Sequence, residues 1–182
     1  MRSRQTSAAL LGVVAFSIGL VACGADDQPT AIVTLKPSLE RAAKDARPFS
    51  GRCETSFAPL TFPPPPVIRQ VDEGECLLSQ LGRTSAHIVQ DIDIAAGTQQ
   101  SVEITLTAAN GDILHASTTG TNTPNGSGVA FQATMTLMGG TGRFANATGR
   151  ATVVGSANFQ TNTASFVLDG VIAYGESLDK KK

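Results

Sequence analysis

Residues 139–149 read Gly-Gly-Thr-Gly-Arg-Phe-Ala-Asn-Ala-Thr-Gly, and they lie between two runs in which apolar and polar residues alternate, 129–138 and 151–159. Alternation with a period of two is typical of strands that bury one face. The glycines at 139, 140, 142 and 149 allow backbone angles with positive φ, which a tight reversal needs. The stretch therefore predicts a β-hairpin, in which Gly139, Gly140, Gly142, Phe144 and Gly149 act as structural turn residues.

Similar short alternating segments follow one another from residue 47 onward. The sequence predicts strands at about 49–58, 66–72, 75–82, 85–95, 100–108, 112–119, 128–138, 149–159 and 164–174. Asn110-Gly111-Asp112 predicts a hairpin turn, and residues 123–128 predict a longer loop. Residues 62–66 read Phe-Pro-Pro-Pro-Pro, and the four prolines offer no N–H donors, so we expect an exposed polyproline linker there.

The alternation also assigns faces to the strands. One side collects the apolar residues Val102, Ile104, Leu106, Phe131, Met135, Leu137, Val153, Phe166, Leu168 and Ile172. The other side is rich in threonine. Strands of this kind joined by short turns favour an all-β fold, an eight-stranded antiparallel sheet closed into a barrel, because closure removes exposed edges. Phe144 would then cover one barrel end. A two-sheet β-sandwich is the alternative.

The N-terminus has the pattern of an export signal. Arg2 and Arg4 precede an uncharged apolar run, 8–21, that is too short to span a membrane. The run ends in Leu-Val-Ala-Cys-Gly, which resembles a bacterial lipobox and implies that Cys23 is lipidated after cleavage. We expect a signal peptide at 1–22, a lipidated tether with a short helix at 23–46, the barrel at 47–176 and a charged tail at 177–182. Gly24 after the cysteine, where aspartate would favour inner-membrane retention, favours the outer membrane.

Export also bears on the two remaining cysteines. Cys53 and Cys76 would face an oxidising compartment, where a disulfide is expected, and its 24-residue loop is worth about 3 kcal/mol. Two buried free thiols are the alternative. Without residues 1–22 the chain keeps 12 basic and 15 acidic residues, a net charge of −3. Such weak acidity argues against nucleic acid as a partner.

The hairpin stretch at 139–149 resembles that of allene oxide cyclases and dirigent proteins, and more closely that of a set of exported bacterial proteins, which also share patterns similar to residues 81–84 and 106–112. The resemblance covers about residues 80–175 and implies an eight-stranded, calycin-like barrel. Allene oxide cyclases hold a reactive fatty-acid epoxide inside the barrel, and dirigent proteins orient radicals or reactive phenols. The resemblance implies an apolar barrel mouth that admits a lipid-like or aromatic molecule. It transfers no active-site residue, because the matched positions are turn glycines and core residues.

Groups that could carry chemistry are few. His87 and His115 lie on separate predicted strands, and their spacing to Asp91, Asp93, Glu103 or Asp112 requires neither a metal site nor an acid/base pair. His87, Asp91 and Asp93 alternate with the isoleucines at 88, 92 and 94, so they are expected to face outward if the isoleucines form the core. Asp169 is likewise expected outside. The sequence contains no nucleophile elbow and no phosphate loop. It thus indicates no cofactor, no metal and no catalytic set.

The leading interpretation is a lipid-anchored protein of the bacterial cell envelope that works by binding a small apolar molecule or another envelope component. Phe131, Met135, Phe166 and Arg143 are the candidate ligand-binding residues, although a salt bridge to a neighbouring carboxylate is the alternative role for Arg143. An isomerase- or cyclase-like enzyme that uses the barrel interior is one alternative function. A structural envelope protein with a solid core is the other. A cavity of roughly 300 Å³ with inward polar groups would favour the first two.

Overall fold

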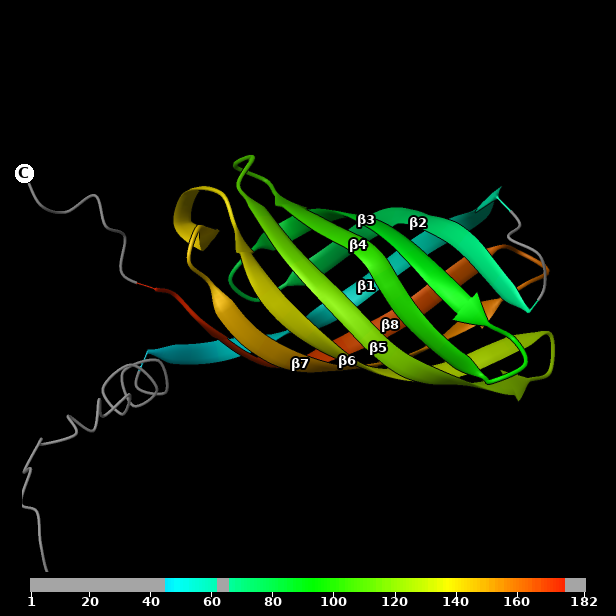
Figure 1. Cartoon of the computed structure of the whole chain (residues 1–182). Helices are drawn as coiled ribbons and strands as arrows, with labels where there is room; N and C mark the ends of the chain where they lie inside the picture. Colours follow the sequence, from blue (N-terminus) through cyan, green and yellow to red (C-terminus); the bar gives the residue numbers. More distant parts are fainter. Residues whose placement is uncertain (1–44, 62–65, 176–182) are drawn as a thin grey trace, which may run out of the picture. The chain divides into compact units, whose positions relative to one another are not determined.

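The structure of the chain is a computed structural model that describes residues 45–61 and 66–175. Eight antiparallel strands form a closed barrel, in which each strand pairs with the next and β8 pairs back with β1 (Figure 1). The strands are β1 (Ala46–Thr61), β2 (Val67–Leu78), β3 (Gly82–Asp93), β4 (Thr98–Ala108), β5 (Ile113–Asn125), β6 (Gly128–Gly140), β7 (Thr148–Asn158) and β8 (Thr163–Ala173). The predicted closed barrel is confirmed. The β1–β8 pairing rules out the sandwich.

Several predictions fall on residues that the structure does not describe. They are the signal peptide, lipidated Cys23, the tether with its helix up to residue 44, residues 62–65 of the polyproline linker and the whole charged tail, 177–182. Ala46, the last residue of the predicted tether, begins β1 instead.

The barrel interior holds the core that the alternation predicted, with one exception. Ile104, Leu106, Met135, Leu137, Val153, Phe166, Leu168 and Ile172 are all buried, and Phe131 packs against this cluster. Val102 was predicted to be inside but is 53% exposed. The cause is a β-bulge in β4. Val89 faces Glu103 while the next residue, Gln90, faces Ser101, so Val102 is the extra residue and the alternation shifts there.

Two boundaries also differ from the predicted ones. Residues 66–72 and 75–82 were predicted as two strands, but they belong to one, β2, which ends at Leu78. The polar run Asp72-Glu73-Gly74-Glu75 looks like a turn in the sequence. Gly74 instead lies flat against β1, where a Cβ atom would come within 2.6 Å of the Thr55 Cα. The predicted loop at 123–128 is also wrong, because Asn125 pairs with Gly128 across a tight turn in which Gly126 has φ +56°.

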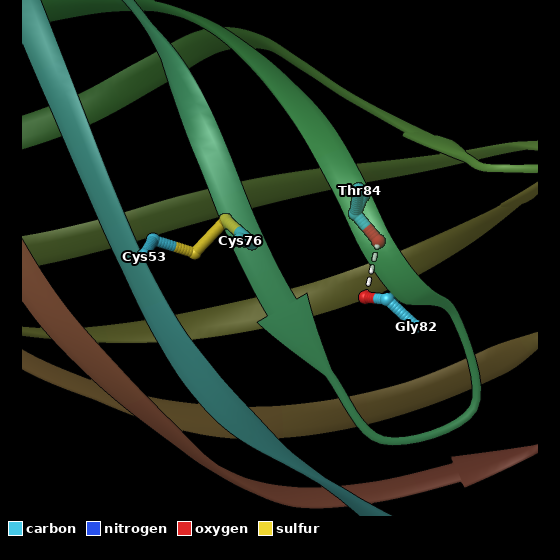
Figure 2. The surroundings of a disulfide bond; sticks show 4 residues. All are labelled: Cys53, Cys76, Gly82 and Thr84. Atoms are coloured by element: carbon cyan, nitrogen blue, oxygen red, sulfur yellow. Dashed lines mark hydrogen bonds between the residues drawn. A yellow bond between two sulfur atoms is a disulfide. The ribbon is translucent and has the colours of Figure 1, made fainter.

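A disulfide joins the first two strands. Cys53 of β1 and Cys76 of β2 are directly opposite in the ladder and are bonded inside the barrel, as Figure 2 shows. The predicted disulfide is therefore confirmed, and the alternative of two free thiols is wrong. Thr84, whose hydroxyl donates to the Gly82 carbonyl, lies on β3 nearby and is fully buried.

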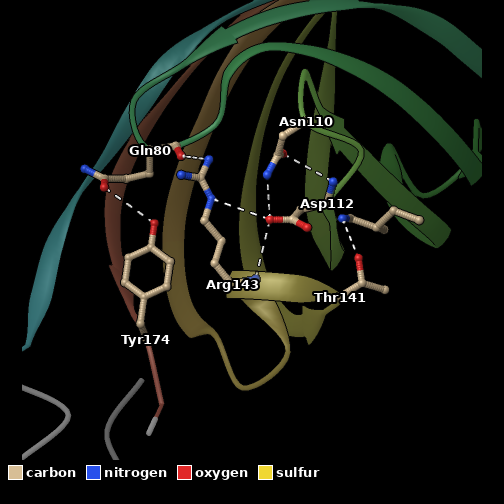
Figure 3. Close-up of polar contacts among 7 residues, drawn as sticks. Gln80, Asn110, Asp112, Thr141, Arg143 and Tyr174 are labelled. Atoms are coloured by element: carbon tan, nitrogen blue, oxygen red, sulfur yellow. Dashed lines mark hydrogen bonds and ion pairs between the residues drawn. The ribbon is translucent and has the colours of Figure 1, made fainter. Parts of the chain in front are cut away.

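One end of the barrel is closed. The short 3₁₀ helix η1 (Gly142–Phe144) follows β6, and the Phe144 side chain is completely buried and stacked on Tyr174 at 6.0 Å. Around it lies a set of polar contacts drawn in Figure 3. The Arg143 guanidinium donates to the Gln80 carbonyl and lies 4.0 Å from the Asp112 carboxylate. The turns β2–β3, β4–β5 and β6–β7 are thereby tied together at this end.

Candidate functional site

The opposite end of the barrel is hollow. Phe57, Ile68, Ile94, Val129 and Phe159 are among the residues that surround a hollow of about 450 Å³, named here the mouth hollow. Ile94 and Phe159 are exposed at its rim, and the Phe57 and Phe159 rings meet edge to face at 6.2 Å. Deeper in the barrel lies an inner chamber of about 60 Å³. The two spaces share Gln70, Ile92, Asn122, Val129 and Phe159 as lining residues, so they are neighbouring parts of one site.

The far wall of the inner chamber is apolar. Phe131 and Met135 of β6 and Phe166 of β8 line it, and the two phenylalanine rings lie 6.1 Å apart. Gly155 of β7 lies between them. A Cβ atom there would come within 2.8 Å of the Phe131 ring and 2.5 Å of the Phe166 Cβ, so the glycine provides the space that both rings occupy. The structure therefore brings together three of the four candidate ligand-binding residues.

The near wall of the inner chamber is polar and centres on Asp72. This side chain points into the barrel from β2 and is only 3% exposed. Its Oδ1 accepts a hydrogen bond of 2.9 Å from the Gln70 amide, and its Oδ2 accepts one from the Gln90 amide of β3. Both carboxylate oxygens are thus held in place by neutral donors, and the group faces the chamber.

Burial controls the ionisation of this carboxyl. Removal from water disfavours the charged form and raises the pKa of Asp72 to about 6, although the hydrogen bonds from Gln90 and Gln70 work in the opposite direction. The outward-facing Glu73 next to it adds a small repulsion that also raises the pKa. The Asp72 side chain consequently changes charge close to neutral pH.

Two further polar side chains at the chamber lack partners. The Thr55 hydroxyl of β1 is buried and makes no hydrogen bond, and the same is true of both the nitrogen and the oxygen of the Asn122 side-chain amide on β5. Thr55 is 5% exposed. Buried polar atoms without partners are uncommon in folded proteins, and each costs about 1–3 kcal/mol. Because these side chains line an open chamber, a bound molecule or water would supply their missing hydrogen bonds.

The other residues considered in the sequence lie elsewhere. Arg143 is at the closed end, bonded to Gln80 and Asp112, so the structure does not bring it to Phe131, Met135 and Phe166. His87 contacts Glu73 on the outer surface, and His115 lies 3.5 Å from the Thr105 hydroxyl, also outside.

Asp91 also lies outside the barrel. It accepts two hydrogen bonds of 2.7 Å from Arg69, and these bonds lower the pKa of the carboxyl. In the described ranges no group of three or more histidine, cysteine or acidic residues is placed to hold a metal ion.

Sequence reasoning missed the polar wall. Side chains two residues apart in a strand point to the same face. Asp72 and Gln70 are an even number of positions from Cys76 and Leu78, which are buried, so the strand pattern places Asp72 and Gln70 inside the barrel as well. The incorrect break at residues 73–74 hid this register. Gln90 similarly lies between Ile88 and Ile92 on the same face of β3. The unpartnered state of Thr55 and Asn122 had no signal in the sequence, because it depends on side chains from other strands.

Comparison with known proteins adds no relative to this picture. The chain matches no protein-family model, no curated protein and no solved structure. Over residues 45–61 and 66–175, no helix has the length and apolar character to cross a bilayer.

Proposed function

We propose that this chain is a lipid-anchored protein of the bacterial envelope that binds a small, mostly apolar molecule in the open end of its barrel. The observation that carries the binding role is the mouth hollow of about 450 Å³, which has mostly apolar walls and leads to an inner chamber with one apolar and one polar wall. Binding pockets of this size, mostly apolar with a few converging polar groups, are typical of small-molecule sites. Exposed Ile94 and Phe159 at the rim favour an apolar ligand body.

The anchoring part of the proposal rests on the sequence around Cys23. If Cys23 carries the lipid, cells that express the chain will incorporate labelled palmitate into it, and Cys23→Ser will abolish that label. Retention of the label in Cys23→Ser would refute lipidation at this residue. Several acyl chains are needed for stable anchoring, so the variant is also expected to leave the membrane fraction.

The binding part is tested by filling the mouth hollow. Val129 lines both spaces, and in Val129→Trp the indole would occupy the hollow. We expect an apolar fluorescent probe, such as N-phenyl-1-naphthylamine, to bind the full chain in lipid nanodiscs after the signal of empty nanodiscs is subtracted. Its affinity should fall about tenfold or more in Val129→Trp, since the contacts of the probe would be lost.

A matched control separates this effect from general damage. Val154 of β7 is exposed on the outer surface of the barrel, so Val154→Trp adds the same side chain away from the hollow. The control should bind the probe like the original chain. Equal binding by all three proteins would refute the mouth hollow as the site.

A second candidate function is an isomerase- or cyclase-like enzyme, and Asp72 is the observation that favours it. A carboxyl with a pKa of about 6 in an apolar chamber has the properties of a general acid or base. On this reading Asp72→Asn would retain ligand and lose turnover, measured as conversion of the ligand recovered by native mass spectrometry. Recovery of the same unaltered ligand from both proteins would count against catalysis.

A further inference from the structure

We propose that Asp72 selects the ligand by its head group: the site binds apolar molecules that end in a primary ammonium group and discriminates against those that end in a carboxylate. The inference rests on the proposed binding function and adds the chemical class of the ligand. It follows from three properties of the inner chamber, namely its charge, its size and its unsatisfied hydrogen-bonding groups.

The charge of the chamber is negative and uncompensated. Among the described residues that line the inner chamber and the mouth hollow, none is lysine, arginine or histidine. The nearest basic partner on β2, Arg69, is paired with Asp91 on the outside. A buried ionised carboxylate without a cation is costly, and a cation that enters the site removes that cost. A carboxylate head would instead face a like charge at short range.

The other charged groups near Asp72 are also acidic, so they add to the negative charge around the chamber. Glu73 projects from the opposite face of β2, and Asp93 lines the rim of the mouth hollow. On the two strands that pair with β2, the inward residues next to Asp72 are uncharged, Thr55 on β1 and Ile88 and Gln90 on β3. The described lining residues contributed by β4 to β8 carry no charge either. Every formal charge that the described residues present to the site is therefore negative.

The size of the chamber fits a small head group on a larger apolar body. A volume of about 60 Å³ has room for a few water molecules or an ammonium group with its adjoining carbon. The mouth hollow, at about 450 Å³, is large enough for an aliphatic or aromatic body. A trimethylammonium head is much bulkier than a primary one and lacks N–H donors, so the chamber should reject it.

The free hydrogen-bonding groups match an ammonium group. A primary ammonium has three donors and no acceptor. Asp72 already accepts one hydrogen bond at each oxygen, and a carboxylate oxygen has capacity for a second. The Thr55 hydroxyl and the Asn122 amide oxygen are acceptors without partners. The chamber thus offers acceptors that the protein itself does not use, next to the one buried negative charge among its described lining residues.

The test compares probes with the same tail and different heads. Octylamine, octanol, octanoate and octyltrimethylammonium are titrated calorimetrically into the full chain in nanodiscs, with empty nanodiscs as the blank. We expect octylamine to bind most tightly, about tenfold or more above octanol, because a hydrogen bond to a charged group is the stronger kind. Octanoate and octyltrimethylammonium should bind more weakly than octanol.

Asp72→Asn is the informative variant, since the amide has nearly the same shape without the charge. It should lose the preference for octylamine over octanol while still binding octanol. Asp169→Asn makes the same chemical change at an exposed position on β8 and should leave the ranking unaltered. Persistence of the octylamine preference in Asp72→Asn would overturn the assignment to this carboxyl.

The pH dependence of the unmodified chain provides a second readout that needs no variant. Octylamine remains protonated throughout the range, so Asp72 is the group that changes. With a free-state pKa of about 6, the ionised fraction and hence the octylamine affinity should fall about tenfold from pH 7 to pH 5, while that of octanol stays level. Equal affinities for amine, alcohol and carboxylate would overturn the head-group inference and leave the binding function intact. Failure of every probe to bind would overturn both.

Discussion

At the scale of single residues, Asp72 has opposite effects on the proposed site and on the fold: the ionised carboxylate would bind an ammonium group, but it lowers the stability of the folded chain. Its pKa is raised from 3.8 to about 6, so the folded chain holds this proton more tightly than the unfolded chain does. The folded state therefore binds more protons between these two values, and its stability falls as the pH rises through them. A shift of this size corresponds to on the order of 3 kcal/mol of lost stability once the carboxyl is fully ionised.

Replacing Asp72 with asparagine should remove this dependence. We expect the free energy of unfolding of Asp72→Asn, relative to that of the original chain, to rise by on the order of 2–3 kcal/mol between about pH 4 and about pH 8. Urea titrations across that range measure the difference. Asp169→Asn is the control, because it makes the same chemical change at an exposed position on β8. A difference for Asp72→Asn that does not change with pH would contradict the raised pKa of the buried carboxyl.

Residues also show how far the sequence could predict this molecule. Alternation placed most core side chains correctly, since each strand buries one face and the signal is local. It failed at Val102 because one extra residue in β4 shifts the inside–outside alternation by one position. Nothing in the sequence near Val102 indicates this bulge. It missed Asp72 because a polar residue in a run of polar residues resembles a turn. Only the parity of distant Cys76 and Leu78 reveals that it faces inward.

At the scale of elements, β1 and β2 are the pair whose association depends most on a covalent link. Their connection includes residues outside the described ranges, whereas the disulfide ties the middle of both strands from inside the barrel. Removing the link with Cys53→Ala and Cys76→Ala together should lower the free energy of unfolding by about 3 kcal/mol, because the unfolded chain regains the entropy of a 24-residue loop.

Urea unfolding of the double variant measures this loss, and the serine double variant serves as a comparison. Cys53 and Cys76 are both buried, so hydroxyl groups at these positions should lower stability further than methyl groups do. An alanine double variant as stable as the original chain would mean that the strand ladder alone holds β1 against β2.

The sequence predicted the boundaries of the strands less completely than it predicted which side chains of each strand face the core. Eight strands were represented among the nine predicted segments, and the error at β2 arose because Gly74 has a tertiary role. It allows β1 to approach closely, which no local pattern specifies. The tight turn at Gly126 was hidden by the neighbouring Pro124, which reads as a loop residue although it pairs with Val129 in the ladder.

At the scale of the whole molecule, the barrel divides into a packed end and an open end. Phe49, Leu114, Phe144, Ile172 and Thr84 are its largest fully buried side chains, and all lie toward the closed end. The mouth hollow and the unpartnered Asn122 lie at the other end. Regions with fewer buried apolar contacts open locally at lower free energy than the global unfolding step, and binding sites are commonly drawn from them.

This asymmetry predicts an uneven pattern of amide hydrogen exchange along each strand. Amides near the closed end, such as those of Leu114 and Ile172, should exchange only through global unfolding, whereas those near Asn122 and Val129 should exchange at least about tenfold faster. A ligand held in the mouth hollow stabilises only the state in which the hollow is formed, so saturating octylamine should slow exchange at the open end selectively. Mass spectrometry of peptides from both ends of β5 compares the two regions within one strand. Uniform protection along β5, unchanged by octylamine, would mean that the barrel unfolds as a single unit and that its open end is as solid as its closed one.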